Sequence, residues 1–163
     1  MKKKLIFLML FTHICFAQGK FAGEFKDLIG LKFVTDKDIP KLKNFKYIGG
    51  SIISDLVVID SFYLSLEVYR KGSTAIVLMN KLIDKTTKQH RIIEVLKIID
   101  VPVNYEIRIS GCTAKNSNPD DEIVAVYYIG NKKSVKLIKE SYVLKDIRFE
   151  KINPKNIKCI NEI

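Results

Sequence analysis

Short stretches in which apolar and polar residues alternate run through the chain and predict a fold built mainly of β-strands. The clearest stretch lies within residues 57–70, where every second side chain is apolar, at Phe62, Leu64, Leu66 and Val68. A pleated strand turns this period of two into one apolar face and one mixed face. Lys71-Gly72-Ser73 supplies a turn before the apolar run of residues 75–78, so we expect a β-hairpin here.

Further extended segments follow from the same alternation and from runs of β-branched residues. They are residues 31–34, 45–53, 92–99, 105–109, 123–129, 135–144, 147–152 and 157–160. The apolar positions of 92–99 also fit a helical stripe, but the excess of Ile and Val favours a strand. Residues 21–31 have the spacing of a short helix that Gly30 is expected to end. The fold class is therefore mainly β or α+β, a sheet-dominated sandwich or partly open barrel with one short N-terminal helix.

The N-terminal 17 residues have the features of a signal peptide. Lysines at positions 2–4 precede the apolar run Leu5–Phe11, which is too short to span a bilayer. Cys15-Phe16-Ala17 suits a cut after Ala17, and this ending resembles those of secreted proteins of Gram-negative bacteria. We expect residues 1–17 to be removed and the mature protein to lie in the periplasm or outside the cell.

Two other interpretations of this segment are weaker. A lipid anchor on Cys15 is disfavoured, because His13 and Ile14 before it are not the small residues usual at such sites. An uncleaved membrane anchor needs a longer apolar run. After processing, we expect no segment that crosses a membrane.

The composition of residues 18–163 indicates a single β-rich domain. These 146 of the 163 residues can bury a sizeable core, and no low-complexity linker divides them. Cleavage removes three of the 28 basic residues and none of the 18 acidic ones, so the net charge falls from +10 to +7. The basic residues are spread evenly, whereas nucleic-acid binders concentrate them, so no nucleic acid partner is expected. A solvated lysine-rich surface explains the excess most simply; contact with anionic polymers, lipid headgroups or an acidic protein is the alternative.

Two cysteines, Cys112 and Cys159, remain after cleavage. An even pair of cysteines in an oxidising compartment is typical of a disulfide. We therefore predict that they are bonded to each other, with two buried free thiols as the alternative.

The C-terminal part of the chain contains a distinctive order of motifs. It runs from an Ile-Glu-Val-Leu strand through Gly111-Cys112, an Asn/Asp loop before residues 121–126, Phe149-Glu150-x-Ile152 and Cys159-x-Asn161-Glu162. This order resembles that of a group of small, signal-bearing, uncharacterised bacterial envelope proteins, and the paired cysteines are its specific part. The resemblance covers somewhat under half of the chain. It implies an envelope location and a disulfide, but no activity.

The mature chain has few of the side chains that catalysis uses most. Its one histidine, His90, lies in a polar segment, where we expect a solvated loop residue. No nucleophile elbow, Walker loop or dinucleotide fingerprint occurs, and Gly49-Gly50-Ser51 is interpreted as a bend or bulge. Two carboxylates suffice for cleaving glycans. The candidates, which we expect on solvent faces of strands, are Asp60, Glu67, Glu94 and Glu106. We predict no catalytic residue, metal or cofactor.

Two surface features remain as candidate binding sites. Residues 116–122 space oxygen-bearing side chains alternately, but Asp121 replaces the glycine that an EF-hand requires, so a plain loop is preferred over a calcium site. Exposed tyrosines with neighbouring lysines are typical of interface centres. The predicted interaction surface consists of Tyr63, Tyr69, Tyr128, Asp120 and Asp121. A second packed layer over the tyrosines is the alternative.

These observations favour an exported, non-enzymatic binding protein of the bacterial envelope. Export, a β-rich fold and the shortage of catalytic groups all point to it. One version is an inhibitor or immunity protein against a secreted toxin, with a protein partner in the envelope. The alternatives are a carboxylate-based hydrolase acting on envelope polymers and a structural or surface accessory protein.

Overall fold

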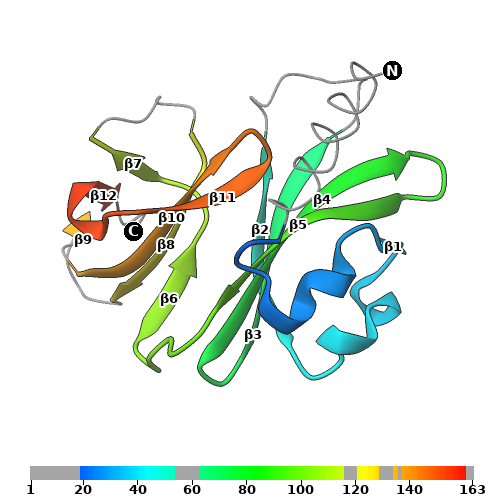
Figure 1. The fold of residues 1–163 in the computed structure, drawn as a ribbon, viewed down its shortest axis with the longest axis horizontal. Coiled ribbons are helices and arrows are strands. Elements are labelled where there is room, and N and C mark those ends of the chain that lie inside the picture. The colour runs from blue at the N-terminus through cyan, green and yellow to red at the C-terminus, as the bar shows by residue number, and fades with distance from the viewer. Residues whose placement is uncertain (1–18, 54–62, 116–120, 129–133, 136, 161–163) are drawn as a thin grey trace, which may run out of the picture.

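The structure is a computed structural model that describes residues 19–53, 63–115, 121–128, 134–135 and 137–160 (Figure 1). The large sheet has the order β1 (Lys32–Phe33), β5 (Gln89–Ile98), β4 (Thr74–Asp84), β3 (Leu64–Lys71), β2 (Lys46–Ile53). The middle sheet has the order β11 (Arg148–Ile152), β10 (Ile138–Lys145), β8 (Ile123–Tyr128), β6 (Tyr105–Arg108). The small sheet has the order β7 (Cys112–Ala114), β12 (Ile157–Ile160), β9 (Ser134–Val135). The 3-10 helices are η1 (Gly23–Leu28), η2 (Asp36–Asp38), η3 (Pro40–Leu42) and η4 (Pro154–Asn156).

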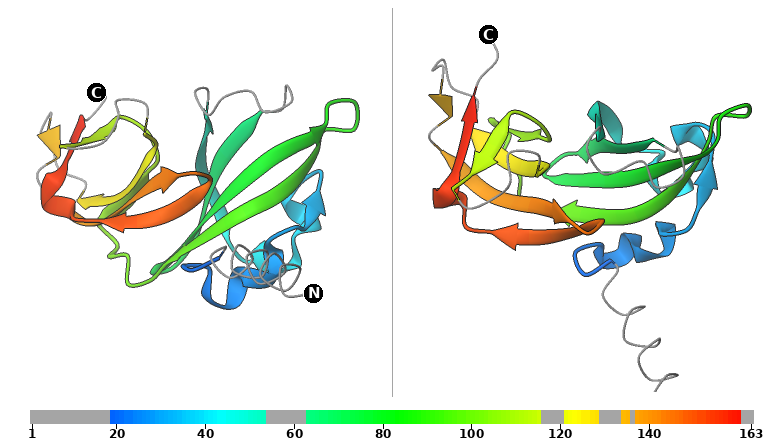
Figure 2. Two further views of the ribbon diagram at one scale, coloured as in Figure 1. Left: turned by 45° about the horizontal axis from the view of Figure 1, so that its top comes forward. Right: turned by 90° about the horizontal axis from the view of Figure 1, so that it is seen from above.

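The large and middle sheets lie at an angle to each other, with β11 close to β5 (Figure 2). One hydrophobic cluster fills the space between them. It includes Leu66, Val77 and Leu96 from the large sheet and Val124 and Leu144 from the middle sheet. Burying an aliphatic side chain of this size contributes about 1.5–3 kcal/mol relative to leaving it exposed. This shared cluster therefore joins the two sheets.

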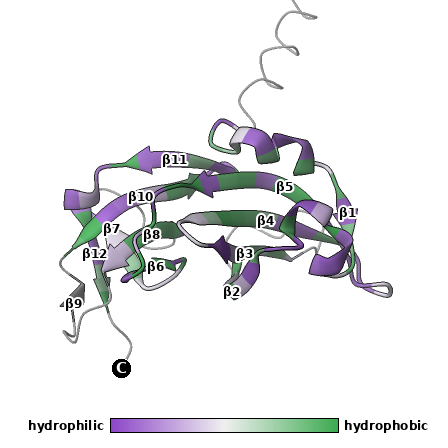
Figure 3. Cartoon of the chain, turned by 90° about the horizontal axis from the view of Figure 1, so that it is seen from below, coloured by the Kyte–Doolittle hydropathy of each residue, from purple (hydrophilic) through white to green (hydrophobic). Residues whose placement is uncertain are grey.

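The opposite face of the large sheet is covered by the helices near the N-terminus. Phe25 and Leu28 of η1 and Leu42 of η3 pack with Ile76 and Leu78 of β4. Consequently β4 is covered on both faces, and every side chain from Ala75 to Met79 is fully buried. Figure 3 shows that hydrophobic residues predominate in this strand.

The N-terminal segment also protects the open edge of β5. β1 pairs with β5 only at Arg91 and His90, which leaves the rest of that edge without a partner strand. The amide of Lys97 donates to the carbonyl of Phe21 at 2.8 Å, and the amide of Ile92 donates to the carbonyl of Leu31 at 3.0 Å. These bonds satisfy backbone groups of the edge strand β5 that could otherwise pair with a strand of another molecule.

The predicted hairpin is confirmed by β3 and β4. Lys71 pairs with Thr74 around a two-residue turn, and Gly72 takes a φ of +57°. Glycine at the first turn position meets the positive φ that two-residue hairpins require. In β2 the pairing with β3 shifts between Tyr47 and Gly49, so the predicted bend or bulge near Gly49 is present as a bulge.

The mainly β class with a short N-terminal helix is confirmed, and the sheets adopt a layered arrangement. The helix predicted within residues 21–31 is the 3-10 helix η1, and the ambiguous segment of residues 92–99 is the strand β5. Among the residues that the structure describes, no helix is both long and apolar enough to cross a membrane. The predicted signal peptide, residues 1–17, lies outside the described residues.

The predicted disulfide is present. Cys112 of β7 pairs directly with Cys159 of β12, and their sulfur atoms are bonded. Both cysteines are buried in a third hydrophobic cluster, where the small sheet packs against Ile123 and Val143 of the middle sheet. The bond therefore fixes the small sheet across its hydrogen-bonded strands.

Replacing Cys112 and Cys159 together by alanine should destabilise the protein. The bridge closes a loop of 47 residues, for which chain entropy predicts a loss of about 4 kcal/mol in the free energy of unfolding. Urea unfolding of the oxidised protein and of the double variant measures this loss. Equal unfolding midpoints would show that the bond contributes nothing to the fold.

Candidate functional site

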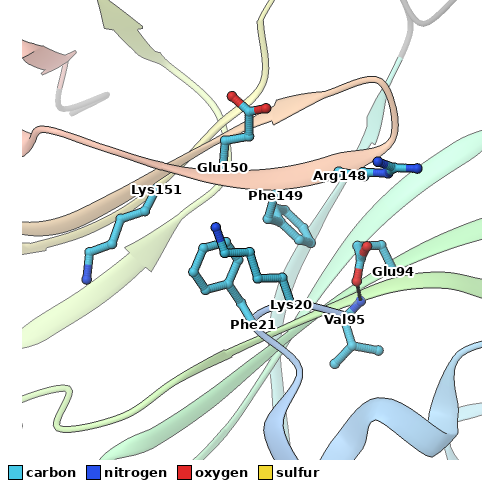
Figure 4. A pocket seen from close by; sticks show the side chains of 8 residues that line it. All are labelled: Lys20, Phe21, Glu94, Val95, Arg148, Phe149, Glu150 and Lys151. Carbon is cyan, nitrogen blue, oxygen red and sulfur yellow. Dashed lines mark hydrogen bonds between the residues drawn. The ribbon is translucent and has the colours of Figure 1, made fainter. Parts of the chain in front are cut away.

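A cavity of about 390 Å³ lies where the N-terminal segment and β11 flank β5 (Figure 4). Lys20 and Phe21 come from the N-terminal segment, Glu94 from β5, and Arg148 and Phe149 from β11. We call this the Glu94 cavity. It combines two aromatic rings, a buried carboxylate and basic side chains, and is therefore the candidate site.

Glu94 lies on β5 and is only 3% exposed. Both of its carboxylate oxygens accept hydrogen bonds from the backbone N–H of Gly19, at 2.9 and 3.1 Å, and Oε1 also accepts from the N–H of Val95 at 2.9 Å. The bond to Gly19 ties the N-terminal segment to β5 across 75 residues of sequence. A buried carboxylate needs such donors, because an unpaired one is very costly.

Burial raises the pKa of Glu94 above its ordinary value of 4.5. The backbone hydrogen bonds from Val95 and Gly19 oppose this rise, and so do the positive charges of Arg148 and Lys26. Because burial is the largest effect, the neutral form of the carboxyl is favoured more strongly in the folded protein than in the unfolded chain.

Basic side chains surround the opening of the Glu94 cavity. The Lys20 ammonium lies 5.3 Å from the centre of the Phe21 ring. Arg148 attracts Glu94 by charge, while Lys151 forms an ion pair with Glu140. Lys20 is exposed and Arg148 is half-buried, so both basic groups are accessible from solvent.

The two carboxylates near the cavity point in different directions. Figure 4 shows Phe149 turned toward Phe21 and Glu94, and Glu150 turned to the other side of β11. Successive side chains of a strand alternate between its faces, which explains this difference. Glycan cleavage by two carboxylates requires both to flank the same bond. The Glu94 cavity does not present that arrangement.

The structure places the described residues of the predicted interaction surface on different elements. Tyr63, which directly precedes β3, is 61% exposed, and Tyr128, the last residue of β8, is 38% exposed. Tyr69, by contrast, is only 3% exposed and belongs to the cluster beneath the helices, so the prediction of an exposed Tyr69 is wrong. Asp121 is half-buried at the start of the segment that leads into β8, and Asp120 lies outside the described residues.

The candidate carboxylates have separate roles. Glu67 accepts a hydrogen bond from the Tyr69 hydroxyl at 2.8 Å, and Glu106 accepts one from the Tyr127 hydroxyl at 2.8 Å. Burial, followed by this bond to Glu106, raises the pKa of Tyr127 to about 12. Asp60 lies outside the described residues.

Two sequence predictions near the cavities are wrong. Glu94 is buried instead of facing solvent. The sequence feature that indicates this burial is the position of Glu94 as the one charged residue within the apolar run of residues 92–96. His90 lies in the strand β5 and not in a loop. Its ring stacks on the ring of Phe33 with 5.5 Å between the ring centres. The polar residues around His90 gave no indication that it pairs with the short strand β1.

The described part of the chain contains no group of three or more His, Cys, Asp or Glu residues that could hold a metal ion. No family model, curated protein or solved structure matches the chain significantly. The function is therefore argued from the residues themselves, and the resemblance to envelope proteins stays a prediction.

Glu94 should make the stability of the protein depend on pH. Its folded-state pKa is raised, so the neutral carboxyl stabilises the fold fully below the unfolded value of 4.5, and this contribution is lost as the pH rises through the folded-state value. Between about pH 4 and pH 7, the urea midpoint of the wild type should fall relative to that of Glu94→Gln. Glu150→Gln, which removes an exposed carboxylate of the same cavity, serves as the control. Parallel curves for the wild type and Glu94→Gln would contradict the assignment.

Proposed function

We propose that this protein is an exported, non-enzymatic binding protein of the bacterial envelope, and that it recognises an acidic group of a partner protein at the Glu94 cavity. An inhibitor or immunity protein against a secreted toxin is the version that fits a partner of this kind. The signal-peptide features of residues 1–17 and the disulfide between Cys112 and Cys159 support the location outside the cytosol.

The observation that carries this proposal is that two basic side chains, Lys20 and Arg148, line the same cavity as the aromatic rings of Phe21 and Phe149. An arginine guanidinium binds carboxylates through several donors, and aromatic rings beside it provide apolar contact. Such combinations are enriched at the centres of protein interfaces. The net charge of +7 that remains after removal of residues 1–17 further favours the approach of an acidic partner.

Glu94 supports binding better than catalysis. Its two oxygens are already engaged by the N–H groups of Gly19 and Val95, so the carboxylate holds the N-terminal segment in place. A general acid or base must instead reach the proton that it transfers. The hydrolase alternative would require a second carboxylate on the opposite side of the bond, and Glu150 is turned away.

The proposal is tested with two double variants that remove the same number of charges. Lys20→Gln with Arg148→Gln alters the cavity, whereas Lys155→Gln with Lys158→Gln removes two exposed lysines of η4 and β12. The mature proteins are immobilised and exposed to envelope extract, and retained proteins are quantified by mass spectrometry. An acidic partner should be retained equally by the wild type and the control, and about tenfold less by the cavity variant.

Two results would contradict this proposal. The first is equal retention of every envelope protein by all three samples, because the cavity would then play no part in recognition. The second is turnover of an envelope polymer that is lost in Glu94→Gln, since that result would favour the hydrolase alternative.

A further inference from the structure

A second cavity, of about 310 Å³, lies on the helix-covered side of the large sheet. Four of its lining residues are aromatic rings from four different strands, namely Phe33 of β1, Tyr47 of β2, Tyr69 of β3 and His90 of β5. Asp36 and Glu67 also line it, whereas lysine and arginine are absent from its lining. We call this the aromatic cavity. Its chemistry is opposite to that of the Glu94 cavity.

The rings of the aromatic cavity pack in two pairs. Phe33 stacks on His90 with an angle of 30° between the planes, and Tyr47 meets Tyr69 edge to face with 5.5 Å between the centres. Phe33 and Tyr69 are buried, but Tyr47 is 49% exposed. Tyr47 therefore forms an accessible outer wall of a cavity whose inner walls are fixed by the core.

The carboxylates of Glu67 and Asp36 both affect the buried phenol of Tyr69. Glu67 accepts a hydrogen bond from the Tyr69 hydroxyl at 2.8 Å. Burial raises the pKa of Tyr69, and the negative charges of Glu67 and Asp36 raise it further. The negative charges of the half-buried Glu67 and the exposed Asp36 thus both act at the cavity.

An orphaned polar atom lies beside these carboxylates. The Nδ1 atom of His90 is buried and has no hydrogen-bond partner among the residues that the structure describes. Buried polar atoms in native proteins nearly always have a partner, which can be a ligand or an ordered water. A bound group with an N–H or O–H donor, or an ordered water, at this position would complete the site.

We propose that the aromatic cavity binds an organic ammonium group, a role separate from the acidic partner of the proposed function. Ring faces attract cations through their electron-rich centres, and two carboxylates add ion pairing. An anionic ligand would meet two like charges there, and a neutral one would leave both carboxylates uncompensated. The ammonium can belong to a small amine or to a lysine side chain of a protein.

Choline and its neutral isostere 3,3-dimethyl-1-butanol test the requirement for charge. Each is titrated into the ¹⁵N-labelled mature protein, and amide shifts are followed by NMR. Choline should shift amides near Phe33, Tyr47 and His90 with a dissociation constant in the millimolar range, and the isostere should bind about tenfold more weakly. Equal binding of the two probes would overturn the proposal.

Variants locate the binding within the cavity. Tyr47→Leu removes the outer ring, and Glu67→Gln removes one charge while its amide oxygen still accepts from Tyr69. Each should weaken choline binding about fivefold. Tyr63→Leu removes an exposed ring that does not line the cavity and serves as the matched control. Equal weakening by all three variants would contradict the assignment.

A peptide pair distinguishes the two sources of the ammonium. Acetyl-Gly-Lys-Gly-amide is compared with the same peptide acetylated on its lysine side chain. Tighter binding of the charged peptide than of choline assigns the cavity to a protein lysine, and the reverse order assigns it to a small amine. Failure of the charged peptide and of choline alike would overturn the proposal. Because no step uses Lys20 or Arg148, these outcomes are independent of the acidic partner.

Discussion

The burial of β4 on both faces is the constraint on which the rest of the structure depends. Side chains from Ala75 to Met79 are fully buried, and they point alternately toward the middle sheet and toward the helices near the N-terminus. A strand of this kind is stable only when each face of its sheet has a cover. The middle sheet covers one face, η1 and η3 cover the other, and β3 and β5 complete the backbone hydrogen bonds on either side.

Both cavities lie at the margins of these two covers. The Glu94 cavity opens where β11 of the middle sheet approaches β5, and the aromatic cavity opens between the segment leading into η2 and the strands of the large sheet. The core holds some of their lining residues, namely Glu94 and Phe149 in the first cavity and Phe33 and Tyr69 in the second. The first cavity presents basic groups and the second presents carboxylates with aromatic rings. The two cavities thus differ in that lysine and arginine side chains line only the first.

Much of the fold could be predicted from the sequence because its strands have strong local patterns. The alternation in residues 64–68, the glycine turn at Gly72 and the cysteine pair each predicted a feature that the structure confirms. Local patterns report which residues share a face, but they do not report what covers that face. Tyr69 lies on the mixed face of β3, and only the distant helices bury it. The same limit hid the aromatic cavity, since its rings come from four strands.

The burial of Glu94 escaped prediction for a related reason. The pairing of β4 with β5 shifts between Met79 and Asn80, where Asn80 pairs with Ile92 and Met79 pairs with Glu94. This bulge gives β5 one extra residue, Ile93, so Ile92 belongs to the cluster beneath the helices, whereas Glu94 stays in phase with Leu96 and Ile98 of the cluster between the sheets. The donor that satisfies the carboxylate, the N–H of Gly19, lies 75 residues away. No spacing within the strand indicates such a partner.

Native-state hydrogen exchange tests the two-sided burial of β4 most directly. If this strand is the centre of the fold, the amides of residues 75–79 exchange only through global unfolding, and their opening free energy equals that from urea unfolding. The amides of Phe21 and Leu31, which lie in the cover, should open at lower free energy. Exchange of residues 75–79 that is faster than exchange in β8 of the middle sheet would contradict the account.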